Sequence, residues 1–318
     1  MSNRKVAYIA FAAICLIWGT TFLGIRVAIE TIPTLYVTGL RFTAAGLILF
    51  AIARARGEAM PMKAAMWKHE IVTALLMVSI ANVTLVWAEN YIPSGLAALF
   101  AATIPLWLAL MDAVFVRLEA LTARRVAGLI IGFSGVALLV LPGLTSPDRR
   151  HFLLGFAGTQ INAISWSLGT LRTKYRPSGV RGAAGPAMQM LLGGSVVLIA
   201  AVMTHAPRDV TFTVRSAAAL AYLTLFGSVI AFTAYHVALK SIPPGRVALY
   251  AYVNPAVAVI AGALVLGEIV TARMVIAMVV ILAGVALAKS APRTQAATTS
   301  VVAAGDNVAS APSEENNT

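Results

Sequence analysis

Long apolar runs, interrupted by single polar positions and separated by short connectors, dominate the chain. A bilayer core about 30 Å thick is crossed by about 20 predominantly apolar residues in a helix. Runs of this kind occur at residues 6–25, 34–53, 71–88, 95–116, 125–141, 153–171, 185–204, 216–239, 247–267 and 273–289. The strict alternation of a membrane barrel is absent, and a helix satisfies its own backbone polar groups in lipid. We therefore predict an all-α membrane protein with ten transmembrane helices.

Charge supports this class and sets an orientation. Only 11% of the 318 residues are charged, whereas soluble domains carry about 25%. With the N-terminus in the cytoplasm, 17 Lys and Arg residues fall on the cytoplasmic side and 6 on the opposite side. This bias follows the positive-inside rule and accounts for the net charge of +12 without a nucleic-acid partner. We expect a multi-pass protein of a bacterial cytoplasmic (inner) membrane with both termini cytoplasmic, and a disordered tail at 290–318.

The two halves of the chain resemble each other. Residues 92–105 match 242–255 at seven of 14 positions, and residues 119–138 match 268–287 at nine of 20. The halves 1–145 and 150–289 would then each hold five spans. Because five is odd, the second repeat would enter the membrane inverted, as in many secondary transporters that work by alternating access. A duplication without mechanistic consequence is the alternative.

Pro105 and Pro255 occupy matching positions inside the fourth and ninth runs. Proline removes a backbone donor and crowds the preceding turn, so each is expected to break its helix near the middle of the membrane. A matched pair of interrupted helices points to a central binding site, although simple packing kinks would also satisfy the pattern.

Arg41 is the strongest functional candidate, because placing a charged residue inside a membrane span costs about 2.5–3.5 kcal/mol of insertion free energy. It either binds a carboxylate or phosphate group of a substrate or ties its helix to a neighbour. Other polar and aromatic residues share helical faces or repeat positions, and Tyr250 and Asn254 lie one turn apart with Tyr252 on another face. The expected substrate-binding residues are Trp18, Thr21, Arg41, Asn82, Glu89, Asn162, Trp166, Gln189, Ser228, Tyr235, Tyr252 and Asn254. Interhelical hydrogen bonding is the alternative for each one.

Several segments together resemble a known family. They are Trp18-Gly19-Thr20-Thr21-Phe22, Pro33 with Arg41-Phe42, Pro93-Ser94-Gly95, and Tyr252-Val253-Asn254-Pro255. This combination resembles the EamA-like branch of the drug/metabolite transporter superfamily, and within it the YedA-type exporters. The resemblance covers about residues 7–288. It implies ten helices, cytoplasmic termini and export of small metabolites such as amino acids or drugs.

Other function classes lack their motifs. There is no Walker-type loop for ATP and no His/Cys spacing for a metal, so we expect no cofactor and no metal. We predict no catalytic residue and no enzyme, with a membrane enzyme or flippase acting on lipid-linked substrates as the alternative. The expected partners are a small-molecule substrate and the bilayer. Proton antiport and uncoupled transport both stay open.

The runs at 126–141 and 274–288 are almost entirely apolar. We expect them at the lipid-facing periphery, or in a homodimer contact through Gly132 and Gly135, because small residues let membrane helices approach closely. Glu119 and Glu268 are repeat equivalents at span ends and are expected to cap helices or to pair with Arg124 and Arg273.

Overall fold

The computed structural model describes residues 3–58, 63–116, 122–175, 178–180, 182–204 and 210–289. Within these ranges the chain forms helices and no strands. The first half contains α1 (Asn3–Ala28), α2 (Thr34–Ala55), α3 (Ala64–Ala74), η1 (Leu75–Ile80), α4 (Ala81–Ala88), α5 (Ser94–Ala101), α6 (Ile104–Met111), η2 (Asp112–Val116) and α7 (Ala123–Leu144). The second half contains α8 (Arg149–Tyr175), α9 (Ala184–Thr204), α10 (Val214–Tyr222), η4 (Leu223–Ile230), α11 (Ala231–Ser241), α12 (Pro244–Val247), α13 (Tyr250–Leu266) and α14 (Ala272–Lys289). The η segments are π-helical.

Seven helical stretches of the described chain are long and apolar enough to cross a bilayer. They are Lys5–Ala28, Thr34–Ala55, Ala64–Ala88, Ser94–Val114, Ala123–Leu144, Ala184–Thr204 and Val214–Ser241. Two further apolar helices, Tyr250–Leu266 and Ala272–Ala288, are shorter, and the long helix α8 is richer in polar residues. The all-helical membrane class predicted from the sequence is thus confirmed. The count of ten spans stays a prediction.

Three prolines mark where helices begin. Pro33, Pro93 and Pro243 directly precede α2, α5 and α12, with ψ angles of 145°, 152° and 143°. Proline fixes its own φ and disfavours a helical conformation in the residue before it. Each connector therefore ends in an extended proline from which the next apolar run starts as a helix.

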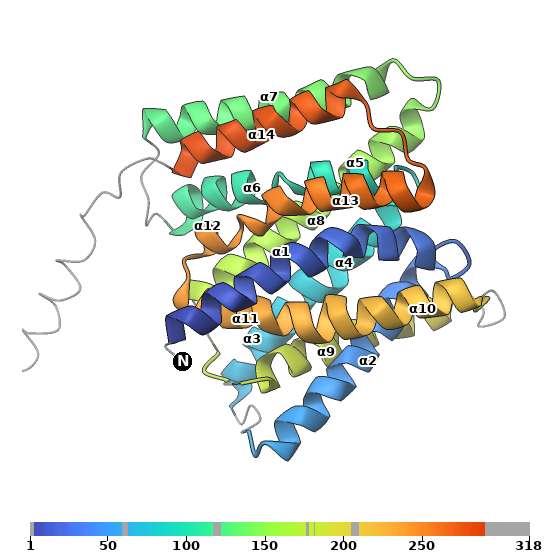
Figure 1. Cartoon of the computed structure of the whole chain (residues 1–318). Coiled ribbons are helices and arrows are strands. Elements are labelled where there is room, and N and C mark those ends of the chain that lie inside the picture. The colour runs from blue at the N-terminus through green and yellow to red at the C-terminus, as the bar shows by residue number, and fades with distance from the viewer. Residues whose placement is uncertain are drawn as a thin grey trace, which may run out of the picture.

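The bundle is built from helix pairs that are distant in sequence. α7 lies beside α14 along one edge of the molecule, and α2 packs against α9 at the opposite side (Figure 1). Between these pairs, α1 contacts α11 and α13, α4 contacts α8, and α5 contacts α13. The buried core lies around α1, α5, α8 and α11.

Glycines set the close approach of α7 and α14. A Cβ on Gly284 would lie 2.2 Å from the backbone nitrogen of Gly132, and one on Gly135 would lie 2.9 Å from the nitrogen of Ile281. A Cβ on Gly132 would also collide with Leu106 at 2.6 Å. The expectation that Gly132 and Gly135 form a homodimer contact is wrong for these two residues, because they already pack against helices of their own chain.

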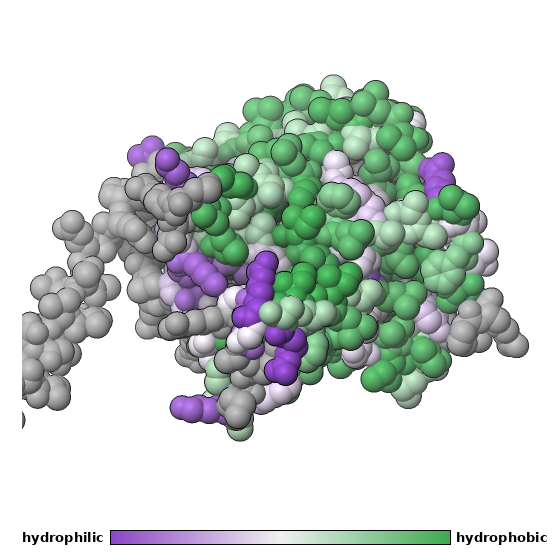
Figure 2. All heavy atoms as spheres, turned by 60° about the horizontal axis from the view of Figure 1, so that its bottom comes forward, coloured by the Kyte–Doolittle hydropathy of each residue, from purple (hydrophilic) through white to green (hydrophobic). Residues whose placement is uncertain are grey.

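The exterior is apolar. Large exposed side chains include Ile130 and Leu141 on α7, Leu264 on α13 and Val279 on α14. Figure 2 shows hydrophobic residues covering most of the visible face, with hydrophilic residues gathered towards one end. A surface of this kind is suited to lipid rather than water.

Four helical stretches deviate from regular α-helix. η1 interrupts the stretch from α3 to α4, and η4 interrupts the stretch from α10 to α11. The other two stretches contain turns, at Ala102 and Thr103 before α6 and at Ala248 and Leu249 before α13, and the π-helical η2 follows α6. π-helical turns are rare and are often found at functional sites.

The turns fall differently with respect to the two prolines. Pro105 lies in the first turn of α6, directly after the break, where its missing N–H is not needed. Pro255 lies inside α13, and the break in that stretch comes several residues earlier, at Ala248 and Leu249. The expectation that Pro255 itself breaks the helix is therefore wrong. α13 continues through it because a proline at its sixth position removes one donor without changing the helical φ.

Candidate functional site

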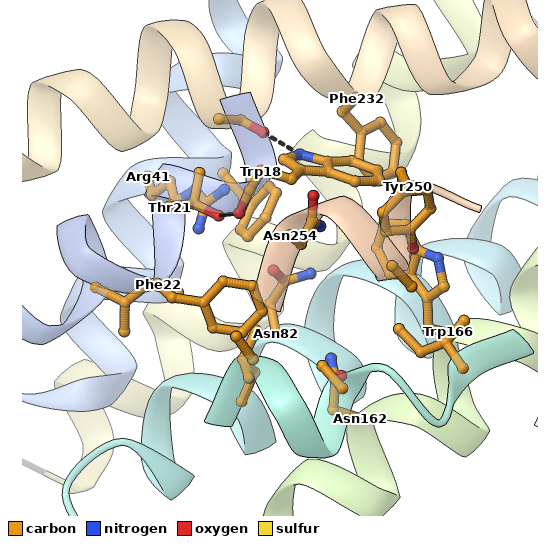
Figure 3. Close-up of a pocket in the computed structure, with 18 residues that line it drawn as sticks. Trp18, Thr21, Phe22, Arg41, Asn82, Asn162, Trp166, Phe232, Tyr250 and Asn254 are labelled. Atoms are coloured by element: carbon orange, nitrogen blue, oxygen red, sulfur yellow. Dashed lines mark hydrogen bonds between the residues drawn. The ribbon is translucent and has the colours of Figure 1, made fainter. Parts of the chain in front are cut away.

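A cavity of about 70 Å³ lies at the centre of the bundle (Figure 3). It has room for about five waters, taking 10–15 Å³ of this measure for each. The helices α1, α2, α4, α5, α8, α11 and α13 all contribute to its wall. It is lined by Trp18, Thr21, Phe22, Ile25, Arg41, Phe42, Asn82, Leu85, Ala98, Ala101, Ile104, Asn162, Trp166, Gly227, Phe232, Tyr250, Ala251 and Asn254.

Aromatic rings form one side of this cavity. The ring centroid of Trp18 lies 5.2 Å from that of Trp166, 5.2 Å from that of Tyr235 and 4.8 Å from that of Tyr250. Trp166 adds Phe232 at 5.9 Å. Most of these contacts are edge-to-face, the arrangement that the quadrupoles of aromatic rings favour. The result is a rigid apolar wall that presents ring faces and edges to a ligand.

Arg41 brings a positive charge to the cavity from α2. Its side chain is buried, its Nε donates to Ser228 Oγ at 2.7 Å, and its guanidinium lies 4.7 Å from the ring centre of Phe42. Gly227 makes room for it, since a Cβ there would lie 2.9 Å from Nη2. No carboxylate oxygen of the described residues lies within 4.0 Å of this guanidinium. Its charge is thus unneutralised by a direct ion pair and faces the cavity.

The amides and the indole of the cavity wall bind carbonyls at the π-helical turns. Asn82 Nδ2 donates to Met77 O at 2.6 Å, and Asn162 Nδ2 donates to Ala81 O at 2.8 Å. Trp18 Nε1 donates to Gly227 O at 3.0 Å, shown by a dashed line in Figure 3. These bonds satisfy carbonyls at the irregular turns and fix the orientation of the wall residues.

Asn254 ties two helices together at the cavity. With its amide oriented so that the nitrogen donates, it reaches Tyr250 O at 3.0 Å and Cys15 O at 3.2 Å. Thr21 donates to Trp18 O at 2.7 Å within α1. Both residues therefore have a structural hydrogen bond as well as a place on the wall.

Seven of the predicted site residues meet at the cavity wall. They are Trp18, Thr21, Arg41, Asn82, Asn162, Trp166 and Asn254. Two more stand directly behind it: Ser228 accepts from Arg41, and Tyr235 packs on Trp18 and hydrogen-bonds the hydroxyl of Thr170 at 2.6 Å. The remaining three predicted residues lie elsewhere.

Tyr252 lies outside the central cavity, packed against a separate cluster formed by Leu106, Leu129 and Val285. Tyr250, two residues earlier, lines the cavity instead. Alternate residues of a helix lie about 200° apart, so only one of these tyrosines can face the same side as Asn254. The i, i+4 spacing of Tyr250 and Asn254 already places these two residues on one face of the helix.

Glu89 lies at the end of α4, fully buried, beyond the cavity wall. Arg26 donates to its main-chain oxygen, while both carboxyl oxygens lack a hydrogen-bond partner within the described chain. Burial raises the pKa of the Glu89 carboxyl well above its usual range; Arg26 opposes this shift, Glu268 adds to it and Arg41 opposes it.

Gln189 lines a different cavity of about 260 Å³, towards the end of the bundle where α3 begins and α11 ends. Its amide bonds Glu70 and His236 there. A third cavity, of about 340 Å³, lies at the other end and includes Arg26, Glu30 and Glu268.

Glu268 caps a helix of the other half of the chain. Its carboxylate accepts from Ser94 N at 2.9 Å, Ser94 Oγ at 2.8 Å and Gly95 N at 3.0 Å, at the first turn of α5. The expectation of a cap is thus met, across the bundle rather than on a neighbouring helix. Glu119 lies outside the described residues.

Sequence reasoning missed the apolar part of the wall. Phe22, Leu85, Ala101, Phe232 and Gly227 look like ordinary membrane-helix residues. Phe22 and Ile25 follow Trp18 and Thr21 at helical spacing, which was the available signal for them. The sequence offered no such signal for the small residues of α5.

An apolar helical bundle around a central cavity with a buried cation and aromatic walls is typical of a multi-pass membrane protein that binds a ligand. Comparison with known proteins agrees. The model of the EamA-like transporter family matches the chain twice, over residues 5–141 and 153–289. The chain therefore belongs to the EamA-like transporter family.

Relatives of known name support this assignment. The "uncharacterized inner membrane transporter YedA" of Escherichia coli K12 is 33% identical over 256 residues, which is 80% of each chain. "Protein PagO" of Salmonella typhimurium is 27% identical, over 80% of this chain and 84% of that one, and an "uncharacterized transporter YvbV" of Bacillus subtilis is 25% identical over 82% and 84%. A crystal structure with 22% identity superposes with a TM-score of 0.66, covering 90% of this chain and 98% of the other, which shows a shared fold.

Proposed function

We propose that this membrane transporter binds a small amphipathic metabolite with an acidic group in the central cavity, and exports it by alternating access. The buried Arg41 guanidinium carries the proposal, since it faces an aromatic cavity without a carboxylate partner within the described chain. A guanidinium is suited to bidentate recognition of a carboxylate or phosphate. The aromatic wall would bind the apolar part of the same molecule.

Many transporters that work by alternating access are built from two halves related by a rotation about an axis in the membrane plane. The family model matches the two halves separately, which supports a duplicated unit in the ten-helix arrangement. Helix packing has the matching pattern: α2 pairs with its counterpart α9, and α7 with its counterpart α14. The contact of α1 with α11 has its counterpart in the contact of α8 with α4. The π-helical turns η1 and η4 also fall at equivalent positions.

Single contacts repeat in the same way. Arg26 near the end of α1 donates to the main-chain oxygen of Glu89, where α4 ends. Lys174, its counterpart in the second half, donates to the main-chain oxygen of Leu239 at 2.6 Å, where α11 ends. A basic residue at the end of the first helix thus holds the third helical stretch of its own half, in each half of the chain, as two copies of one repeat would.

Orientation follows from charge. Lys63, Lys68, Lys174 and Lys240 belong to the connectors and helix ends on the side of the N-terminus, which we assign to the cytoplasm. Export would then run from the end where α1 begins to the end that holds Glu268. The homodimer suggested by the sequence would have to use a surface other than Gly132 and Gly135.

Reconstitution into liposomes tests this function. A panel of zwitterionic amino acids, apolar carboxylates and amine-containing drugs is loaded, and efflux is measured for each compound. We expect carboxylate-bearing compounds with an apolar part to leave fastest. Arg41→Lys should raise the KM by about tenfold, since it loses the planar double donor and one charge-assisted bond.

A matched control comes from Arg125→Lys, another buried arginine, which pairs with Asp112 at 3.5 Å and does not line the cavity. It should leave the KM unchanged. Equal effects of the two substitutions, or movement only of lipid-linked compounds between leaflets, would contradict the proposal.

A further inference from the structure

The cavity of about 260 Å³ contains a chain of three hydrogen-bonded side chains from three helices. Glu70 comes from α3, Gln189 from α9 and His236 from α11. Gln189 Nε2 lies 2.7 Å from Glu70 Oε2, and Gln189 Oε1 lies 3.1 Å from His236 Nε2. Ser178, in the connector between α8 and α9, donates to the second oxygen of Glu70. Glu70 and Gln189 are almost completely buried.

The outer bond of this chain fixes one proton. His236 Nδ1 lies 2.9 Å from the main-chain oxygen of Phe232, and a carbonyl oxygen only accepts. Nδ1 therefore carries a hydrogen in every state in which this bond exists. The protonation of Nε2 then depends on which group of the Gln189 amide faces it.

The amide of Gln189 has one donating end and one accepting end, so it links the states of its two neighbours. With Glu70 ionised, the NH₂ group must face the carboxylate, the amide oxygen faces His236, and Nε2 must carry a proton. With Glu70 protonated, the amide turns over, accepts from the carboxylic acid and donates to a neutral His236. The other two combinations place two acceptors or two donors against each other.

We propose that Glu70, Gln189 and His236 form a proton-binding site that holds a single exchangeable proton, on His236 in one state and on Glu70 in the other. In the exchange, Glu70 gives its proton to water in the cavity, the amide turns by half a turn, and His236 Nε2 takes a proton from that water. The number of protons stays the same, and no other reactant is required. A role for this site in proton-coupled export rests on the proposed function and would in addition require the proton to leave from one of the two states.

Ionisable side chains lie near both Glu70 and His236. Arg172 and Lys174 on α8 and His69 on α3 lie near Glu70, and Lys240 on α11 lies near His236. Tyr235 packs its ring on the same imidazole at 6.1 Å. Basic side chains therefore lie close to both ends of the hydrogen-bonded chain.

Nuclear magnetic resonance on the full chain in lipid nanodiscs reads the proton directly. The sequence has four histidines, so a ¹⁵N-histidine label gives few ring signals, and His236→Gln assigns the one of interest. The carboxylic acid band of Glu70 is followed by infrared difference spectroscopy. We expect loss of the Nε2 proton of His236 to coincide with gain of the acid band, at every pH where the protein is folded.

Two substitutions shift the balance in a predicted direction. Glu70→Gln satisfies the chain with a neutral His236, so the ratio of imidazolium to neutral ring should fall at least about tenfold. Ser178→Ala lies in a connector and removes a donor that stabilises the ionised carboxylate. It should move the proton from His236 to Glu70 by about tenfold, because a hydrogen bond to a charged group is lost.

The exposed His151, which pairs with Asp148, is the internal control and should titrate alike in all samples. A His236 signal unchanged in both variants, or a neutral His236 together with an ionised Glu70, would overturn the proposal. These signals are measured without substrate. A failed transport assay with the expected spectra would therefore count against the proposed function alone, whereas unchanged spectra with active export would count against the proton site alone.

Discussion

The cap that Glu268 places on α5 should be a latch that holds the end of the bundle opposite the N-terminus. Glu268 lies in the connector between α13 and α14, and its carboxylate accepts three hydrogen bonds from Ser94 and Gly95. Gly262 permits this approach, because a Cβ there would lie 2.5 Å from Glu268 Oε2. Breaking the latch should loosen α5 from α13 without touching the cavity wall directly.

The magnitude follows from the contacts. Loss of a side-chain cap costs about 0.5–2 kcal/mol, and loss of a negative charge at a helix N-terminus costs about 0.3–1 kcal/mol. Glu268→Ala should therefore destabilise the start of α5 by about 2 kcal/mol, which corresponds to about 30-fold in an opening equilibrium. Gly262→Ala should reach a similar value by displacing the carboxylate.

Hydrogen exchange followed by mass spectrometry measures this opening in the peptide that covers residues 94–101. We expect exchange to be about 30-fold faster in Glu268→Ala. Glu30→Gln is the matched control, since Glu30 is an exposed carboxylate that pairs with Arg215 at 3.2 Å near the same end. Exposed pairs contribute only about 0–1 kcal/mol. Unchanged exchange in Glu268→Ala would refute the latch.

Three further predictions follow from the packing and the charges. Because the folded-state pKa of Glu89 is raised above its ordinary 4.5, the folded protein binds this proton more tightly, so stability should fall as pH rises from 4.5 until the carboxyl is ionised, and Glu89→Gln should remove this slope in thermal unfolding. Gly284→Val should separate α14 from α7 and lower the Tm by more than Ser134→Val, a change on the exposed side of α7. Tyr250→Ala should weaken substrate binding in the liposome assay by about tenfold, whereas Tyr252→Ala on the other face should leave it unchanged.

The fold class was readable from the sequence because lipid imposes one strong rule, that long apolar runs become helices. This rule concerns whole runs, so the positions of helix ends and helix breaks were harder to predict from the sequence. The run predicted at 247–267 is divided in the structure by the turn at Ala248 and Leu249, which no proline at that point announces. Pro255 gave the visible signal but lies within α13. A break depends on where carbonyls find other partners, and this is decided by neighbouring helices.

The sequence pointed to wall residues of the cavity where a side chain has a high free-energy cost in lipid. Arg41, Asn82, Asn162 and Asn254 stand out for this reason, and all four line the cavity. Gln189 stood out equally and lies in another cavity, because sequence shows the cost of a polar group but not its partner. The residues most easily missed were apolar wall residues such as Phe232, whose role depends on position alone.

Phe232 also connects the two cavities, and this constrains how they can influence each other. Its main-chain oxygen accepts from His236, while its ring lines the central cavity and lies 5.9 Å from Trp166. Tyr235, one turn along the same helix from Phe232, fills the space between Trp18 and His236. A ligand that displaced either ring would therefore move the backbone or the imidazole that the Glu70 chain depends on. This single turn of α11 is therefore enough to connect the central cavity with the proton site, because its side chains lie at the first and its hydrogen bonds belong to the second.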